Sequence, residues 1–172
     1  LTGLYDTILR ALRDEPGFWW HTYKRVWKQN FKSSLLPGVI FTMLWALIGY
    51  AVFALPQITT VSAGFALILL DVAILLTLGS YFWMQNALFD SSVSKKLSNC
   101  VRMFLGFLPQ TALSAVFQLG YWLLMAILIP RCAFVFLLTG LWVPNLLAMM
   151  AVYAPIEKSL HLEMLIRGLR SK

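Results

Sequence analysis

Residues 35–55 read LLPGVIFTMLWALIGYAVFAL, and this uncharged stretch decides the class of fold. About twenty consecutive apolar residues form a helix long enough to cross the hydrocarbon core of a bilayer. Stretches without Asp, Glu, Lys or Arg cover residues 33–70, 72–89, 103–130 and 132–156. A water-soluble domain of 172 residues cannot bury that much continuous apolar sequence in one core. The sequence therefore predicts an integral membrane protein.

The uncharged stretches divide into four predicted spans. They are expected at about 35–55, 61–86, 109–129 and 132–153. Amphipathic helices, with apolar residues at helical spacing and basic residues opposite, are expected at the membrane surface. These helices cover residues 1–34, 94–108 and 155–172. The predicted fold is an all-α polytopic transmembrane helical bundle that forms a single domain over residues 1–172.

The two halves of the chain have the same predicted organisation. A basic amphipathic helix, a Leu-Pro pair, a span, a short turn and a second span describe residues 18–86 and again 94–153. Leu36-Pro37 and Leu108-Pro109 mark corresponding points. Structural duplication is common in membrane proteins, and the even number of spans in each half predicts a parallel repeat. Pro144 interrupts the fourth span, where a proline frees a backbone carbonyl and kinks the helix.

The positions of the basic residues predict the orientation. Of the 14 Lys and Arg residues, every one except Arg131 falls on one side of the predicted membrane. Loops rich in Lys and Arg stay in the cytoplasm. We therefore expect the amphipathic helices and the C-terminus to face the cytoplasm.

A basic and aromatic helix precedes the first span. Its membrane-surface residues are Trp19, Tyr23, Lys24, Arg25, Trp27, Lys28 and Lys32. Aromatic rings beside a basic stripe are typical of a helix that lies among lipid headgroups. The net charge of +7 and this pattern also fit an RNA-binding surface. The attached span favours membrane lipids as the partner instead, and no nucleic-acid binding is expected.

Gly38, Thr42 and Ala46 recur every four residues in the first span. Small residues at this spacing form a smooth helix side that allows another membrane helix to approach closely. We expect this stripe to be a docking face for a partner protein.

Asp71 is the first candidate for a polar site at the membrane midplane. It lies near the middle of the second span, where an ionised carboxylate is costly. One interpretation is a site for a proton, a coupling ion or a substrate. The other is a protonated structural group that bonds a neighbouring helix through Thr42, Thr139 or Asn145.

Asn145 is the second candidate for that site, because its amide could line a cavity. More often, an Asn beside a proline such as Pro144 kinks and locks a helix. Gln85 and Gln118 are interpreted as packing contacts between helices. The sequence contains no HExxH, GxSxG, GxGxxG, CxxC or Walker phosphate loop, and no metal-ligand spacing of His, Cys and acidic residues. We therefore expect no enzyme, no cofactor and no metal.

Several short segments resemble the YesL-like family of bacterial membrane proteins. Residues 23–34, YKRVWKQNFKSS, resemble the family's aromatic and basic segment F-K-x-N-F-K-Q-S. Residues 1–5, LTGLY, resemble the end of its T-I-G-x-A-x-x-A-L-Y segment. Residues 97–99 and 107–111 resemble its L-K-N-A and L-P-x-T elements. The proline that the family has at the aromatic end of the second span is absent from residues 81–85.

The resemblance implies one further span before residue 1, and hence five spans in the whole protein. The family's domain has no assigned function, and its genes commonly lie beside carbohydrate ABC importers in Gram-positive bacteria. The resemblance thus implies a non-enzymatic accessory subunit that binds the permease subunits of such an importer in the cell membrane. The alternative is a small transporter or channel that uses Asp71 and Asn145 at the midplane.

Overall fold

The computed structural model is built from α-helices, with no strand in the residues that it describes. These are residues 2–12, 19–58, 61–89, 91–128, 134–135, 139–140 and 142–160. The principal helices are α1 (Thr2–Leu12), α2 (Trp19–Ile58), α3 (Val61–Leu88), α4 (Val93–Gly106), α5 (Leu108–Leu128) and α7 (Trp142–Leu160). The all-α prediction is confirmed.

Three of these helices are long and apolar enough to cross a membrane. Their span-length segments are Tyr23–Ala54 of α2, Ala63–Leu88 of α3 and Leu108–Leu128 of α5. They correspond to the first three predicted spans, and they make this chain a membrane protein.

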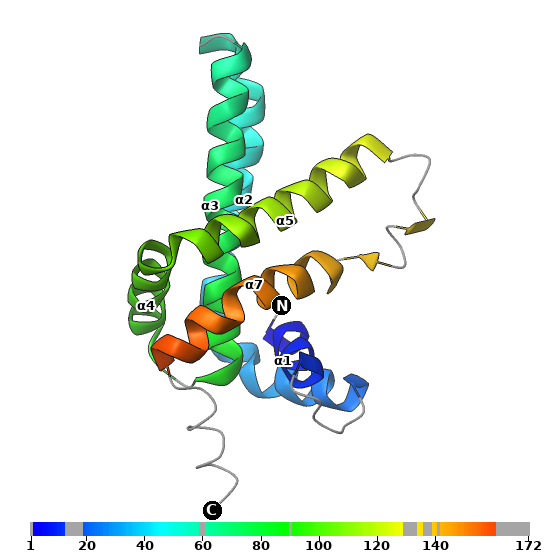
Figure 1. The fold of residues 1–172 in the computed structure, drawn as a ribbon, viewed down its shortest axis with the longest axis vertical. Helices are drawn as coiled ribbons and strands as arrows, with labels where there is room; N and C mark the ends of the chain where they lie inside the picture. Colours follow the sequence, from blue (N-terminus) through cyan, green and yellow to red (C-terminus); the bar gives the residue numbers. More distant parts are fainter. Residues whose placement is uncertain are drawn as a thin grey trace, which may run out of the picture.

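The helices are arranged as two diverging pairs on a common base. The α2–α3 hairpin projects away from the rest of the chain (Figure 1). The α5–α7 pair lies side by side and crosses the lower half of α3, while α1 and α4 pack around the base.

The predicted boundary between the basic surface helix and the first span is not a break in the helix. Residues 19–58 form one continuous helix, and Pro37 lies inside it rather than in the first turn of a separate span. The helix is bent: its N-terminal part runs at a steep angle to the part that pairs with α3 (Figure 1). A proline donates no backbone hydrogen bond and its ring crowds the carbonyl four residues earlier, so Pro37 bends the helix without ending it.

The bounds predicted for the fourth span, 132–153, are wrong. The helix α7 begins at Trp142 and continues through Pro155 to Leu160. Pro144 lies in its first turn, where the missing N–H would have no helical partner, and so it does not kink the middle of a span. This helix is not among the three that are long and apolar enough to cross a membrane. Residues 129–133, 136–138, 141 and 161–172, which include much of the predicted helix 155–172, lie outside the described residues.

The predicted repeat agrees with the structure only in outline. Each half contains a pair of adjacent long helices, α2 with α3 and α5 with α7. The Leu-Pro pairs differ, however: Leu36-Pro37 lies inside α2, whereas Leu108-Pro109 begins α5 after a turn at Phe107. The surface helix is therefore separate from the span in the second half alone.

The surface helix α4 has the predicted extent but not the predicted outward face. Its Lys96 side chain is 3% exposed and Cys100 is fully buried. The apolar Leu97 and Leu105 are 50% and 62% exposed. Part of the predicted polar face thus packs against the protein, while the apolar face points outward, where lipid can cover it.

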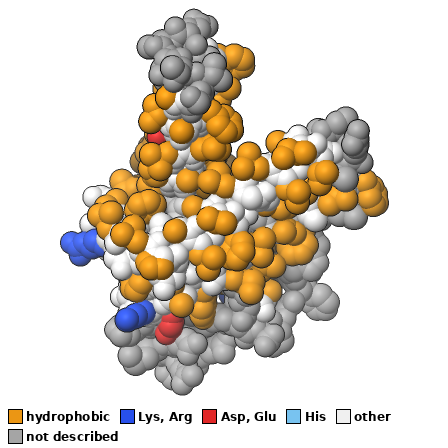
Figure 2. Space-filling model, turned by 45° about the horizontal axis from the view of Figure 1, so that its top comes forward, with side chains coloured by type: hydrophobic (Ala, Val, Ile, Leu, Met, Phe, Trp, Pro, Cys, Tyr) orange, Lys and Arg blue, Asp and Glu red, His pale blue; other side chains and the backbone are white. Residues whose placement is uncertain are grey.

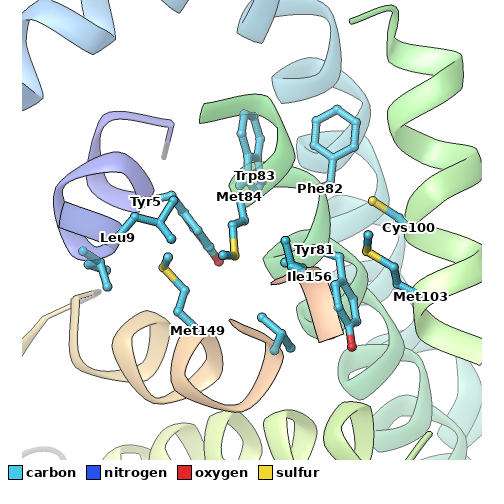
Figure 3. Close-up of a cluster of buried hydrophobic side chains, with 12 residues drawn as sticks. Tyr5, Leu9, Tyr81, Phe82, Trp83, Met84, Cys100, Met103, Met149 and Ile156 are labelled. Atoms are coloured by element: carbon cyan, nitrogen blue, oxygen red, sulfur yellow. The ribbon is translucent and has the colours of Figure 1, made fainter. Parts of the chain in front are cut away.

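The hydrophobic core joins the first helix to the last. Figure 3 shows its side chains converging from α1, α3, α4 and α7. Its members include Tyr5, Leu9, Tyr81, Phe82, Trp83, Met84, Cys100, Met103, Met149 and Ile156. The apolar face of α1 packs into the protein rather than remaining free for lipid, because Tyr5 and Leu9 are 2% and 1% exposed. Helix α1 instead packs against α2, α3 and α7.

Candidate functional site

A cleft of about 800 Å³ lies between the α2–α3 hairpin, the α5–α7 pair and α1. Its aromatic walls are Trp27, Phe31, Phe41, Trp45, Trp83 and Trp122. The lining residues of α2 recur at spacings of three and four, which places them on one face of that helix. Protein sites for small molecules have volumes of about 300–1,000 Å³ and mostly apolar walls. The cleft therefore has the size and lining of a ligand site.

Aromatic contacts hold the wall between α2 and α3. The ring centroid of Phe41 lies 5.5 Å from that of Phe82 and 5.7 Å from that of Trp83. The Phe82 and Trp83 rings meet edge to face at 5.6 Å. Such pairs contribute beyond the area that they bury, so the two helices are fixed to each other at the level of the cleft.

Uncharged polar side chains form the floor of the cleft. The Tyr5 hydroxyl donates to Oδ1 of Asn145 over 2.7 Å and lies 3.4 Å from Oγ of Ser80. Nε2 of Gln118 donates to Oγ of Ser80 and to Oγ of Ser114, each over 3.2 Å. These bonds link α1, α3, α5 and α7. Burial raises the pKa of Tyr5 to about 12, so its hydroxyl stays a neutral donor at physiological pH.

The side-chain carbonyl of Gln118 keeps an open acceptor. Gln118 lines the cleft and is only 2% exposed. Among the described residues, none donates a hydrogen bond to its Oε1. In the described part of the chain, every fully buried side-chain N or O atom has a hydrogen-bond partner. Since Oε1 has none, it is not fully buried and retains accessible surface. It can accept a hydrogen bond from a molecule in the cleft.

A second polar cluster joins the floor to the base of the hairpin. Nδ2 of Asn86 donates to Oγ1 of Thr2 over 3.1 Å and to Oγ of Ser34 over 2.9 Å. Its Oδ1 accepts from the ammonium of Lys96 over 2.8 Å. Thr2 and Ser34 also line the cleft. The sequence analysis missed this cluster, because its members come from four helices and share no local spacing.

The two candidates for a midplane polar site lie in different surroundings. Asn145 lines the cleft and accepts the hydrogen bond from Tyr5. Asp71 is exposed on α3 and is not part of the cleft lining. No described residue bonds Asp71; Thr42 and Thr139, the suggested partners, donate to backbone carbonyls four residues earlier in their own segments. The cleft thus contains Asn145 without Asp71.

The small-residue stripe of α2 is open. A Cβ atom built on Gly38 meets nothing within 4 Å, and Thr42 and Ala46 are exposed. Gly38 and Thr42 line the cleft, whereas Ala46 does not. Within the described residues, the stripe therefore does not pack one helix against another.

The basic part of α2 presents its charges outward. Lys24, Arg25, Lys28 and Lys32 are exposed, and so is Trp27. Tyr23 instead packs toward Gly3 of α1 and stacks with Trp20, their ring centroids lying 5.9 Å apart. The side chain of Trp19 lies outside the described residues.

The surface shown in Figure 2 is mainly apolar. Hydrophobic side chains cover the projecting hairpin, and the Lys and Arg side chains in this view lie away from its tip. The described surface includes exposed Val39, Ile40, Met43, Leu47, Phe53, Val116 and Ile127. Apart from the acidic side chain on the hairpin, this distribution is that of helices that face lipid and carry their basic residues away from the hairpin tip.

Residues 1–52 match a family model described as "Protein of unknown function, DUF624". The match covers α1 and most of α2, and it includes the basic and aromatic segment. It is consistent with the resemblance to the YesL-like family. No curated protein and no solved structure matches the chain.

Proposed function

We propose that this protein is a non-enzymatic accessory subunit that binds another membrane protein through its α2–α3 hairpin. The supporting observation is the low internal packing of α2. In the most apolar stretch of α2, only 6% of the residues are buried inside the protein. The corresponding shares are 33% for α3 and 22% for α5. Lipid provides no hydrophobic force between helices, so membrane helices associate through small-residue faces and polar contacts. The open stripe of Gly38, Thr42 and Ala46 is such a face.

The proposed partner is the permease part of a carbohydrate ABC importer in the cell membrane of a Gram-positive bacterium. This part of the proposal rests on the resemblance to the YesL-like family. The exposed Lys24, Arg25 and Lys28 fit it. Each basic residue near anionic lipid contributes roughly 1 kcal/mol, which holds the bent N-terminal part of α2 at the cytoplasmic surface beside a neighbouring permease.

Co-purification in a mild detergent tests the docking face. The tagged wild-type chain, expressed in its native bacterium, should retain permease subunits that mass spectrometry identifies. Ala46→Leu with Gly49→Leu, which changes α2 outside the cleft lining, should release them. So should Gly38→Leu with Ala46→Leu. The matched control is Ala112→Leu with Gly120→Leu, which changes the same residue types at the same eight-residue spacing on exposed positions of α5.

Two results would contradict the proposal. Hairpin variants that retain permeases at the wild-type level would remove α2 as the docking face. A wild-type chain that never retains a permease would remove the accessory role itself.

Accessibility labelling tests the proposed orientation. Both native cysteines are first replaced by serine, and single cysteines are then introduced. An impermeant maleimide added to intact cells should label a cysteine at Thr59 or Arg131 but not one at Lys95 or Lys172. External labelling at Lys95 would reverse the orientation and separate the basic residues from the cytoplasmic surface.

A small transporter or channel is the second candidate function. The observation that favours it is the cleft, which places Asn145 and Gln118 between span-length helices. Flux assays on proteoliposomes that contain this chain alone distinguish the two functions. Flux without any partner favours the transporter, whereas its absence together with stable permease binding favours the accessory subunit.

A further inference from the structure

We propose that the cleft binds an uncharged lipid whose head carries a free hydroxyl group, with diacylglycerol as the simplest example. This inference concerns the cleft alone and does not depend on the docking partner. It rests on the helices that line the cleft, the position of the hydrogen-bonding groups in the lining, and the open acceptor of Gln118.

Span-length helices supply most of the lining. The helices α2, α3 and α5 each contribute, and all three are long and apolar enough to cross a membrane. Exposed apolar side chains continue along α2 and α5 outside the cleft. A molecule dissolved in the bilayer therefore reaches the cleft by diffusing along these surfaces, without leaving hydrocarbon.

The hydrogen-bonding groups of the lining gather toward the base of the hairpin, where Trp27 and Phe31 also line the cleft. At this base, Ser34 is tied to Asn86, near the C-terminal end of α3. Tyr5 and Gln118 form hydrogen bonds to Ser80, which precedes Asn86 in α3 and therefore lies nearer the hairpin tip. Beyond Ser80 toward the hairpin tip, the α3 residues in the lining are Gly79, Leu76, Leu75 and Val72, which face Phe41 and Trp45 of α2. This order suits an amphiphile, with its head beside Tyr5 and its hydrocarbon chain along the hairpin.

The described part of the lining carries no formal charge. None of the described residues that line the cleft is Asp, Glu, Lys, Arg or His. The buried ammonium of Lys96 lies behind Asn86, to which it donates, and is not part of the lining. A phosphate or an ammonium head would lose its hydration here without gaining an opposite charge. The cleft thus favours an uncharged head.

The open acceptor selects a hydroxyl-bearing molecule. Nε2 of Gln118 is already committed to Ser80 and Ser114, which orients its Oε1. Because Oε1 is accessible from the cleft and no described residue donates to it, a ligand hydroxyl that donates to it gains binding free energy. The free hydroxyl of diacylglycerol supplies that donor, whereas a triacylglycerol or an alkane does not.

Photocrosslinking tests the site directly. The purified full chain is reconstituted in phosphatidylcholine vesicles that contain a trace of diacylglycerol with a diazirine on its acyl chain. After illumination, mass spectrometry should locate the label on peptides that contain cleft residues of α2 and α3. Excess unlabelled diacylglycerol should compete, whereas phosphatidylglycerol, triacylglycerol and soluble maltose should not.

Two pairs of variants connect the label to the cleft. Gly38→Phe fills the cleft from a position where an added Cβ meets nothing within 4 Å, and Gly120→Phe is the matched change on exposed α5 outside the lining. Only Gly38→Phe should abolish cleft labelling. Gln118→Leu should weaken competition by diacylglycerol about five- to tenfold. Gln110→Leu, outside the lining, should not change it.

Several outcomes would overturn the inference. Labelling spread evenly over the exposed apolar surface, or equal labelling of the Gly38→Phe and wild-type chains, would show that the cleft is not the site. Equal competition by phosphatidylglycerol would show that the cleft does not select an uncharged head, and equal competition by triacylglycerol would show that it does not select a hydroxyl group. Competition by maltose alone would assign the cleft to a soluble sugar instead. If the Gln118→Leu chain does not fold, the Gly38→Phe comparison still decides the matter.

Discussion

The hydroxyl of Tyr5 donates a 2.7 Å hydrogen bond to Oδ1 of Asn145, a residue 140 positions away in the chain. Tyr5 lies in α1 and Asn145 in the first turn of α7, so this bond joins the first described helix to the last. The Tyr5 side chain is 2% exposed. Because the bond links α1 to α7 at the lining of the cleft, it helps to fix the floor.

Tyr5→Phe should lower the free energy of unfolding by about 1 kcal/mol, because it removes a buried donor and leaves Asn145 without that partner. Denaturant unfolding of the detergent-solubilised protein, followed by tryptophan fluorescence, measures the change. The matched control is Tyr50→Phe, since the Tyr50 side chain is 71% exposed. Equal effects of the two substitutions would mean that the Tyr5 hydrogen bond contributes nothing to stability.

The long helices could be predicted because hydropathy and length decide them within one segment. The predicted spans 61–86 and 109–129 agree closely with α3 and α5. The errors in the predicted helix boundaries fall at prolines. Pro37 bends α2 without ending it, and Pro144 begins α7 rather than kinking a span. A proline restricts backbone geometry, but tertiary contacts decide whether the helix bends, begins or ends there.

The direction in which each helix face points could not be predicted by the same rule. In α4 the apolar Leu97 is exposed and Lys96 is buried, because lipid can cover an apolar face and Asn86 accepts from the ammonium. The polar floor depends on partners that are 75 to 140 positions apart in the case of Tyr5. No local periodicity reports such pairs, and of the floor residues only Asn145, marked by the proline beside it, and Gln118, as a contact between helices, were singled out from the sequence.

Lys96→Met should destabilise the protein more than Lys95→Met. The Lys96 ammonium donates to the side-chain carbonyl oxygen of Asn86, whose amide nitrogen in turn donates to Thr2 and Ser34. Removing a charged partner from a buried hydrogen bond costs about 1–3 kcal/mol. Lys95 is exposed, so its replacement should leave the unfolding midpoint within error. The same denaturant assay compares the two variants, and a reversed order would contradict the buried cluster.

The thiol of Cys100 should resist alkylation in the folded protein. Its side chain is fully buried, and burial raises its pKa to about 12, while the hydrogen bond from Gln85 acts in the opposite direction. An exposed thiol, with a pKa of about 8.5, reacts much faster as the pH rises from 7 to 9.5. In a Cys132→Ser chain, Cys100 should react slowly with a maleimide over that range and quickly after denaturation.

The same pKa change has a consequence for stability. Because the folded-state pKa of Cys100 lies above that of an unfolded thiol, its contribution is complete below about pH 8.5 and is lost as the pH rises toward 12. Cys100→Ala should therefore reduce the alkaline loss of stability. An unfolding midpoint that falls equally in both chains between pH 8.5 and 10.5 would assign the loss to other groups.

Asp71→Asn should leave folding, permease co-purification and flux unchanged. Asp71 is exposed on α3, no described residue bonds it, and it lies outside the cleft. The Asn amide has nearly the same size as the carboxyl group and can donate a hydrogen bond, so it should preserve a structural contact of the Asp71 side chain within the membrane. Asp71→Leu removes the donor and serves as the comparison. If Asp71→Leu alone releases the permeases, the carboxyl group bonds the partner. If Asp71→Asn folds normally but abolishes proton- or ion-dependent flux in proteoliposomes, the carboxylate carries charge across the membrane, and the transporter function replaces the accessory one.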